Sequence, residues 1–248
     1  ADIFPKELQS AYCGTLYSPP TPVQSILTRL GIDRIPMYTV ENACASGSSA
    51  VHLLHKDIAS GYCDIGIALG VESLSTFQRK FGKGLLVIEG DLQGKLGLTM
   101  PSFFAKMCNR LMEQRGATLE DICYPSIKNH KAGMTNPYSQ YKTEVTFEEI
   151  MASPMIADPI TVLQCCPQSD GAAAVILCSK EYYKKHNKNT RRPPVRIAGS
   201  VISVSGYEDS SFDPLALKSM IDGAKTACNV AGVDARKDID VVELHDAF

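Results

Sequence analysis

The 248-residue chain is long enough for one large domain or two smaller ones, and its 44% hydrophobic and 21% charged residues are typical of globular proteins. A net charge of −2 gives no basis for binding nucleic acid or an anionic membrane, and no apolar run is long enough to span a bilayer. The nine cysteines form no C-x-x-C pair, so we expect no zinc site and no disulfide framework, and a reducing compartment fits best.

The N-terminal third predicts a β–α–β unit, because apolar runs alternate with helical spacing of apolar side chains. The expected elements are a strand ending at Gly14, a helix over 22–30, a strand over 35–40, a helix to about Ser60 and a buried strand over 65–71. Nothing at residue 1 resembles the start of a domain, so we expect the true N-terminal elements to be missing.

Cys44 lies between the second of these strands and the following helix, within Asn42-Ala-Cys-Ala-Ser-Gly-Ser-Ser-Ala50. Unpaired N–H groups and partial positive charge at a helix start favour the thiolate, which is the nucleophilic form of cysteine. The small residues 45–48 would leave the sulfur open to an acyl group. The alternative is a buried structural cysteine, which is a common role for this residue.

Residues 78–155 are richer in Lys, Met, Gly and Pro and contain no second clear β–α–β unit, so we interpret them as an inserted subdomain of helices and loops. Pro101 to Gly116 predicts one helix, with Pro in the first turn and Gly beyond the end. Thr118 to Asp121 resembles a capping box that opens another helix toward Lys131, and 146–151 predicts a short helix.

The sheet pattern is expected to resume at Ile160 and to continue through the end of the chain. The expected elements are a turn at 168–171, a buried strand over 172–177, a helix end and polar linker over 182–192, a strand over 195–204, a loop over 205–214, a helix over 215–231 and a strand over 240–244. Because a domain seldom stops directly after a buried strand, we expect the chain to be truncated after Phe248.

Four ordered motifs give the chain a resemblance to the thiolase superfamily, closest to the sterol carrier protein x type thiolases. They are N-x-C-x-S-G-x-x-A around Cys44, K-N-H-x-x-G-x-x-N-P-Y at 128–138, S-D-G-A-A-A at 169–174 and H-D-A-F at 245–248. The resemblance implies an α/β fold of layered αβαβα type, made of two similar halves with a subdomain inserted in the first. The expected parts are residues 1–77 and 156–192 for the first half, 78–155 for the insertion and 193–248 for an incomplete second half.

The resemblance also implies roles for individual residues. Cys44 would attack the carbonyl of a 3-oxoacyl-CoA and carry the acyl group as a thioester, with its own N–H helping to stabilise the oxyanion. His245 would hold a water in the oxyanion hole for the other thioester, which is that of the CoA substrate. The alternative is a strand-end histidine whose hydrogen bonds are satisfied by solvent. Cys166 and Ser169 would contact the coenzyme A arm; the alternative for Cys166 is a small buried residue beside Cys165.

We therefore expect an acyltransferase that cleaves a 3-oxoacyl-CoA, as in β-oxidation, or runs the reverse Claisen condensation. The family's later G-H-P histidine and C-x-G cysteine would lie beyond Phe248. The alternatives are a ketoacyl-synthase-like or aldolase-like enzyme, and a non-catalytic subunit that binds acyl-CoA.

Coenzyme A is the expected co-substrate, with no permanently bound cofactor and no metal. The expected partners are a second copy, paired at the sheet edge near 35–41, and a small OB-fold, zinc-ribbon subunit. The expected compartment is the cytoplasm, with a peroxisome or mitochondrion as alternatives.

Overall fold

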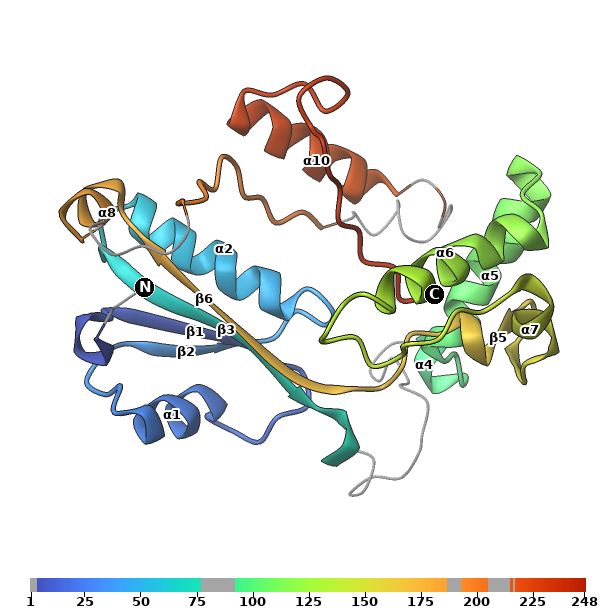
Figure 1. The fold of residues 1–248 in the computed structure, drawn as a ribbon, viewed down its shortest axis with the longest axis horizontal. Coiled ribbons are helices and arrows are strands. Elements are labelled where there is room, and N and C mark those ends of the chain that lie inside the picture. Colours follow the sequence, from blue (N-terminus) through green and yellow to red (C-terminus); the bar gives the residue numbers. More distant parts are fainter. Residues whose placement is uncertain (1–3, 77–91, 187–192, 205–214, 216) are drawn as a thin grey trace. The chain divides into compact units, whose positions relative to one another are not determined.

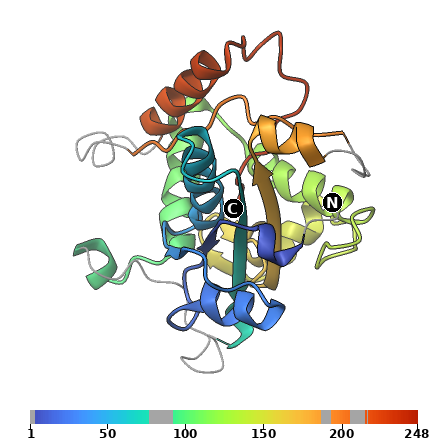
Figure 2. The same cartoon turned by 90° about the vertical axis from the view of Figure 1, so that its left-hand side faces the viewer.

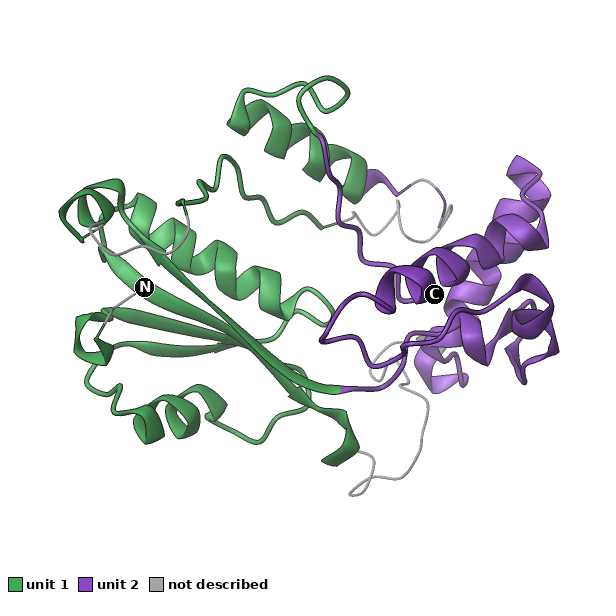
Figure 3. Ribbon diagram, in the orientation of Figure 1, with its two compact units in different colours: residues 1–77, 170–204, 219–239 green, residues 78–169, 205–218, 240–248 purple. Residues whose placement is uncertain are grey.

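A computed structural model describes residues 4–76, 92–186, 193–204, 215 and 217–248. The chain divides into two compact units (Figure 3). Unit 1 comprises residues 1–77, 170–204 and 219–239, and unit 2 comprises residues 78–169, 205–218 and 240–248.

Unit 1 is built on a four-stranded sheet in the order β2-β1-β3-β6 (Figure 1). The strands are β1 (Ser10–Gly14), β2 (Met37–Val40), β3 (Ile65–Ser73) and β6 (Asp170–Cys178). β1 pairs in parallel with both β2 and β3, whereas β6 runs antiparallel to β3. The predicted β–α–β unit is present as β2–α2–β3, with β1 lying between its two strands. The carboxyl ends of β1, β2 and β3 therefore meet at one edge of the sheet, where open α/β sheets bind ligands.

Helices cover both faces of this sheet (Figures 1 and 2). They are α1 (Pro22–Leu27), continued by the 3₁₀ turn η2 (Thr28–Leu30), and α2 (Ser46–Ala59). Unit 1 also contains η1 (Pro5–Glu7), α8 (Lys180–His186) and all but the first residue of α10 (Lys218–Ala231). Gly31 follows η2 in the left-handed region with φ +72°, as predicted for a residue that ends a helix.

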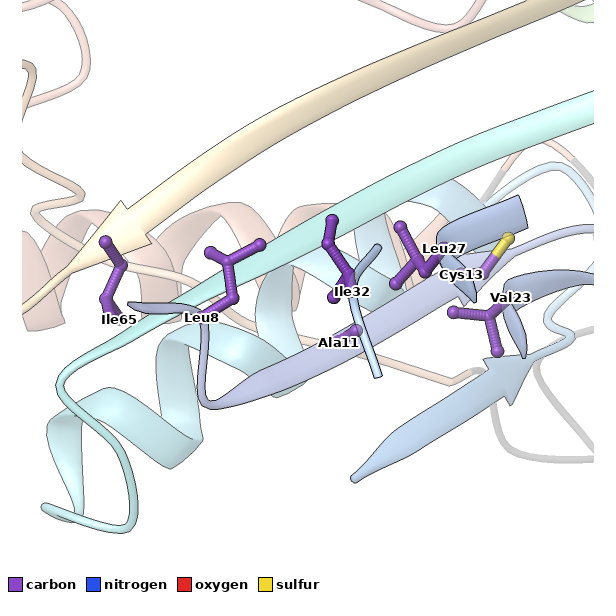
Figure 4. Close-up of a cluster of buried hydrophobic side chains, with 7 residues drawn as sticks. All are labelled: Leu8, Ala11, Cys13, Val23, Leu27, Ile32 and Ile65. Carbon is purple, nitrogen blue, oxygen red and sulfur yellow. The ribbon is translucent and has the colours of Figure 1, made fainter. Parts of the chain in front are cut away.

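Strand alternation explains how one sheet supplies two apolar clusters. Ala11 and Cys13 pack with Val23 and Leu27 of α1 on one face (Figure 4). Tyr12, between them in sequence, points to the other face, where the buried residues are Ala50 and Leu54 of α2, Cys63, and Ala68 of β3. The helical spacing seen in the sequence thus corresponds to the buried stripe of α2.

Unit 2 is mainly helical, as the composition of residues 78–155 indicates. Its elements are α4 (Leu92–Lys95), α5 (Met100–Arg115), α6 (Leu119–Gly133), α7 (Phe147–Ala152), the strands β4 (Met155–Ala157) and β5 (Ile160–Thr161), and η3 (Val162–Gln164). The predicted capping box is present: the Thr118 side chain accepts the Asp121 N–H and the Asp121 carboxylate accepts the Thr118 N–H. α5 ends at Gly116, whose φ of +69° is the left-handed conformation expected of a C-terminal glycine.

Several strand predictions are wrong. Residues 195–204 form no strand, because this segment lies between helices: Ser200 hydrogen-bonds to His52 of α2, and Gly199 is so close to Ala227 of α10 that a side chain would not fit. Residues 240–244 also lack a strand partner. A strand needs a neighbouring strand whose N–H and C=O groups pair with its own. An apolar run in the sequence does not show that such a neighbour is present.

Two further expectations require correction. Ile160 begins β5, which pairs with β4 in a separate two-stranded sheet, so the main sheet resumes at Asp170. Asp170 and Gly171, predicted as a turn, already belong to β6, and this strand is mostly exposed rather than buried. Its place at the edge of the sheet explains the difference, since one side of an edge strand has no neighbour. Within the described ranges, no helix has both the length and the apolar character needed to cross a bilayer.

Candidate active site

Cys44 occupies a short turn between β2, which ends at Val40, and α2, which begins at Ser46. The cysteine is exposed and lies one residue before the helix cap at Ala45. The preceding residue, Ala43, has φ +45°, a left-handed conformation that is uncommon for a residue with a Cβ. Such backbone conformations persist only where the surrounding structure holds them, and they concentrate at functional sites.

Hydrogen bonds from nearby side chains hold this turn. The Ser46 hydroxyl accepts the Asn42 N–H at 2.8 Å and donates to the Ala43 carbonyl at 2.7 Å. The Asn42 amide donates to Ser49 Oγ at 2.9 Å, and Glu41 accepts the Ala43 N–H at 2.7 Å. The polar residues of N-x-C-x-S-G-x-x-A therefore fix the backbone on both sides of the cysteine.

A hollow of about 410 Å³ lies at the carboxyl edge of the sheet in unit 1. Its lining includes Ala43 and Ser46, which flank Cys44 in the turn. The other lining residues are Gly14, Thr15, Leu16, Gly70, Val71, Glu72, Gly171, Ala172 and Ala173. The backbones of β1 and α2 approach closely here: a Cβ at Gly14 would lie 2.5 Å from the Gly47 nitrogen and closer still to the Ser46 carbonyl. Small residues thus leave open space beside the cysteine turn.

Glu72 is a residue of this region that the sequence reasoning missed. Its Oε2 accepts the N–H groups of Leu16 at 2.8 Å and Tyr17 at 3.1 Å, and the Thr15 hydroxyl lies at 3.3 Å. The signal in the sequence was a carboxylate directly after the apolar run 65–71, at the carboxyl end of a strand. Asp170 of the S-D-G motif also holds backbone, because its carboxylate accepts the N–H and hydroxyl of Ser75.

The other predicted site residues, Cys166, Ser169 and His245, belong to unit 2, whereas Cys44 belongs to unit 1. Cys166 is exposed, so the interpretation as a buried pair with Cys165 does not hold, and its N–H donates to the Ala247 carbonyl at 2.9 Å. Unit 2 thus brings Cys166 and the H-D-A-F tetrapeptide together. Ser169 donates to the Gln140 side chain.

The H-D-A-F tetrapeptide is attached to the helices of unit 2 by its last residues. Asp246 accepts the Asn129 amide of the K-N-H motif at 2.5 Å, and Lys128 donates to the other end of that amide at 2.6 Å. The Phe248 ring stacks on Phe104 of α5 with a centroid distance of 4.6 Å. His245 itself is exposed. Two motifs singled out separately in the sequence are therefore in direct contact.

Burial distinguishes several other thiols from the exposed Cys44. Desolvation raises the pKa of the buried Cys13, Cys63 and Cys123 thiols above the ordinary value, and the pKa of Cys165 is raised to about 11 by burial and by Cys166. Among the described residues, no group of three or more His, Cys, Asp and Glu side chains is arranged to hold a metal ion. His52 forms a hydrogen bond with the Ser200 hydroxyl, with 2.9 Å between Nδ1 and Oγ.

Comparison with known proteins identifies a family match over most of the chain. The model of the thiolase N-terminal domain matches residues 1–181. The chain is 34% identical to the benzoylsuccinyl-CoA thiolase subunit BbsB of Thauera aromatica, over 98% of this chain and 62% of the relative. It is also 34% identical to bovine sterol carrier protein 2, over 97% of this chain and 46% of the relative. The acetyl-CoA acetyltransferase of Methanothermobacter thermautotrophicus is 35% identical, over 90% of this chain and 57% of the relative. The chain spans about half the length of these relatives.

Solved structures share the fold at lower sequence identity. The structure of an Ltp2-ChsH2(DUF35) aldolase matches with a TM-score of 0.74 and 21% identity, over 93% of this chain and 60% of that one. Human mitochondrial 3-ketoacyl-CoA thiolase in complex with CoA matches with a TM-score of 0.67 and 21% identity, over 98% of this chain and 69% of that one. The α/β fold predicted from the motifs is therefore a thiolase fold.

Proposed function

This chain belongs to the thiolase family, and from that premise we propose that it transfers the acyl group of a 3-oxoacyl-CoA to coenzyme A, with Cys44 as the nucleophile. The observation that carries the proposal is the exposed Cys44, held in a left-handed turn ahead of α2 and flanked by residues that line the hollow. Such a position gives a thioester carbonyl access to the sulfur and places it near the N–H groups of a helix start.

The proposed reaction cleaves a 3-oxoacyl-CoA. The Cys44 thiolate attacks the 3-oxo carbonyl, the C2–C3 bond breaks, and the C2 carbanion takes a proton and leaves as acyl-CoA. The thiol of coenzyme A then loses a proton, which balances the one taken by C2, attacks the Cys44 thioester, releases the shortened acyl-CoA and returns the thiolate. The same steps in reverse give the Claisen condensation. His245 would stabilise the oxyanion of the CoA thioester, while Cys166 and Ser169 would contact the coenzyme A arm.

Acylation of Cys44 by acetyl-CoA tests the proposal directly. After incubation with acetyl-CoA, we expect peptide mapping by mass spectrometry to find an acetyl thioester on Cys44 that hydroxylamine removes. Cys44→Ser should abolish the label. Cys178→Ser is the matched control, since Cys178 is also exposed but lies on β6, and this variant should acetylate normally. Acetylation that survives in Cys44→Ser contradicts the proposal.

An acyl-CoA-binding subunit without catalysis is the alternative from another class. It predicts that acyl-CoA protects Cys44 from iodoacetamide while no thioester forms. An aldolase is supported by one structural relative, the Ltp2-ChsH2(DUF35) aldolase, and it predicts carbon–carbon cleavage that persists in Cys44→Ser. Product analysis of the parent and this variant therefore separates the three activities.

Two assemblies are part of the proposal. A homodimer would pair through β2, which is an edge strand of the sheet, and light scattering should show a dimer that Tyr38→Lys weakens. A small OB-fold, zinc-ribbon subunit is supported by relatives named as a thiolase subunit and as an aldolase with a DUF35 component. Co-purification of the chain with such a subunit, followed by light scattering of the purified complex, tests this second assembly.

A further inference from the structure

The pairing of β1 with β3 ends before residues 15–17. Gly14, the last residue of β1, lies opposite Gly70 of β3. Strand β3 continues to Ser73, whereas the segment that follows β1 leaves the sheet. The N–H groups of Leu16 and Tyr17 lie beyond this paired stretch. Glu72 supplies the acceptor instead: one carboxylate oxygen takes both N–H groups, at 2.8 and 3.1 Å. A charged acceptor makes stronger hydrogen bonds than a neutral one.

The segment held by Glu72 is also a wall of the hollow. Thr15 and Leu16 line it on one side, and Ala43 and Ser46 of the cysteine turn line it on another. The two sides meet at Gly14, where the backbone of the wall touches the first turn of α2 without room for a Cβ. A shift of residues 15–17 therefore changes the space beside Cys44.

We propose that Glu72 is a positioning residue, whose carboxylate fixes residues 15–17 and thereby sets the size of group that Cys44 can accept. This inference rests on the proposed function, because the group that Cys44 accepts is an acyl chain only if the protein is an acyltransferase. The other carboxylate oxygen, Oε1, is shielded from solvent and has no hydrogen-bond partner among the described residues. Only one oxygen is engaged, so the amide oxygen of glutamine can reproduce the arrangement.

Three variants separate positioning from other roles. Glu72→Ala removes the acceptor, whereas Glu72→Gln retains an oxygen for Leu16 and Tyr17 but removes the charge. Glu7→Ala is the matched control, because Glu7 also accepts a backbone N–H, that of Phe4 at 2.7 Å, and does not line the hollow. Circular dichroism of all three variants checks that the fold is retained.

The readout is the rate of Cys44 alkylation by iodoacetamide and by a bulky maleimide, followed at the Cys44 peptide. The ratio of the two rates cancels any change in thiolate reactivity. We expect Glu72→Ala to change this ratio by about tenfold, since displacements of about 1 Å at a site have effects of that size or larger. Glu72→Gln and Glu7→Ala should keep the parent ratio.

An unchanged ratio in Glu72→Ala overturns the inference, as does a Glu72→Gln variant as altered as Glu72→Ala. Acetylation of Cys44 by acetyl-CoA is measured in parallel and should fall in Glu72→Ala alone. If the parent is never acetylated, the proposed function fails, and the alkylation ratio still decides the role of Glu72. The two failures are therefore distinguishable.

Discussion

Replacement of Gly14 by alanine tests the close approach between β1 and the start of α2. The added Cβ would lie 2.5 Å from the Gly47 nitrogen and closer still to the Ser46 carbonyl, and both are backbone atoms that no rotamer change can move. Overpacking in a tight interior costs about 1–3 kcal/mol or more, and a backbone clash belongs at the upper end. We expect Gly14→Ala to lower the stability of unit 1 by about 3 kcal/mol, which corresponds to roughly 10 °C in Tm.

Hydrogen exchange of the β1 and β3 amides measures this change within unit 1. Gly47→Ala is the matched control: its Cβ would meet no atom within 4 Å, and alanine in a helix is favoured over glycine by up to about 1 kcal/mol. The control should therefore leave protection unchanged or raise it. Equal protection in Gly14→Ala and the parent would refute the close approach, and with it the geometry of the hollow.

Three other predictions follow from buried groups. The pKa of the Tyr12 phenol is raised by burial and by its 2.7 Å hydrogen bond to Asp57, so its contribution to stability is full below about pH 10 and is lost as pH rises through the folded pKa. Tyr12→Phe should flatten the alkaline loss of stability in urea titrations. Thr161→Val should cost about 1–3 kcal/mol, since the fully buried hydroxyl is bonded to Gln164 and its loss leaves polar groups unpaired. Leu54→Ala should cost about 2–5 kcal/mol through a cavity in the α2 cluster, as measured by thermal unfolding.

Local patterns predicted the helices and the cysteine turn well. Capping residues fix helix ends through bonds over three or four residues, so Thr118 with Asp121 identifies the start of α6 without any tertiary information. The strand–Cys44–helix arrangement is similarly local, because β2, the turn and α2 are consecutive. Apolar spacing predicted the helix to about Ser60, whose buried apolar residues are Ala50 and Leu54.

Strand predictions failed where the outcome depends on a distant partner. The run at 195–204 has the apolar content of a strand, yet Ser200 and Gly199 contact helices α2 and α10. Residues 172–177 did form a strand, but their exposure follows from the position of β6 at the sheet edge. Strand order is a property of the whole sheet, and an apolar run does not encode it.

The same distinction between local and distant information applies to the candidate site. Asn42, Ser46 and Ser49 act within seven residues of one another and Glu41 directly precedes them, so one short local segment contains the side chains that hold the cysteine turn. Glu72 accepts backbone N–H groups 55 and 56 residues away in the sequence. Every residue except proline has such an N–H group, so the identities of Leu16 and Tyr17 do not indicate this contact. The sequence shows a carboxylate after the apolar run 65–71, but the backbone that this carboxylate holds becomes visible only when the strands are in register. We therefore propose that the acyl-chain preference of this protein is set by backbone contacts at the strand ends, whereas the cysteine motif holds the turn of the proposed nucleophile but not the space beside it.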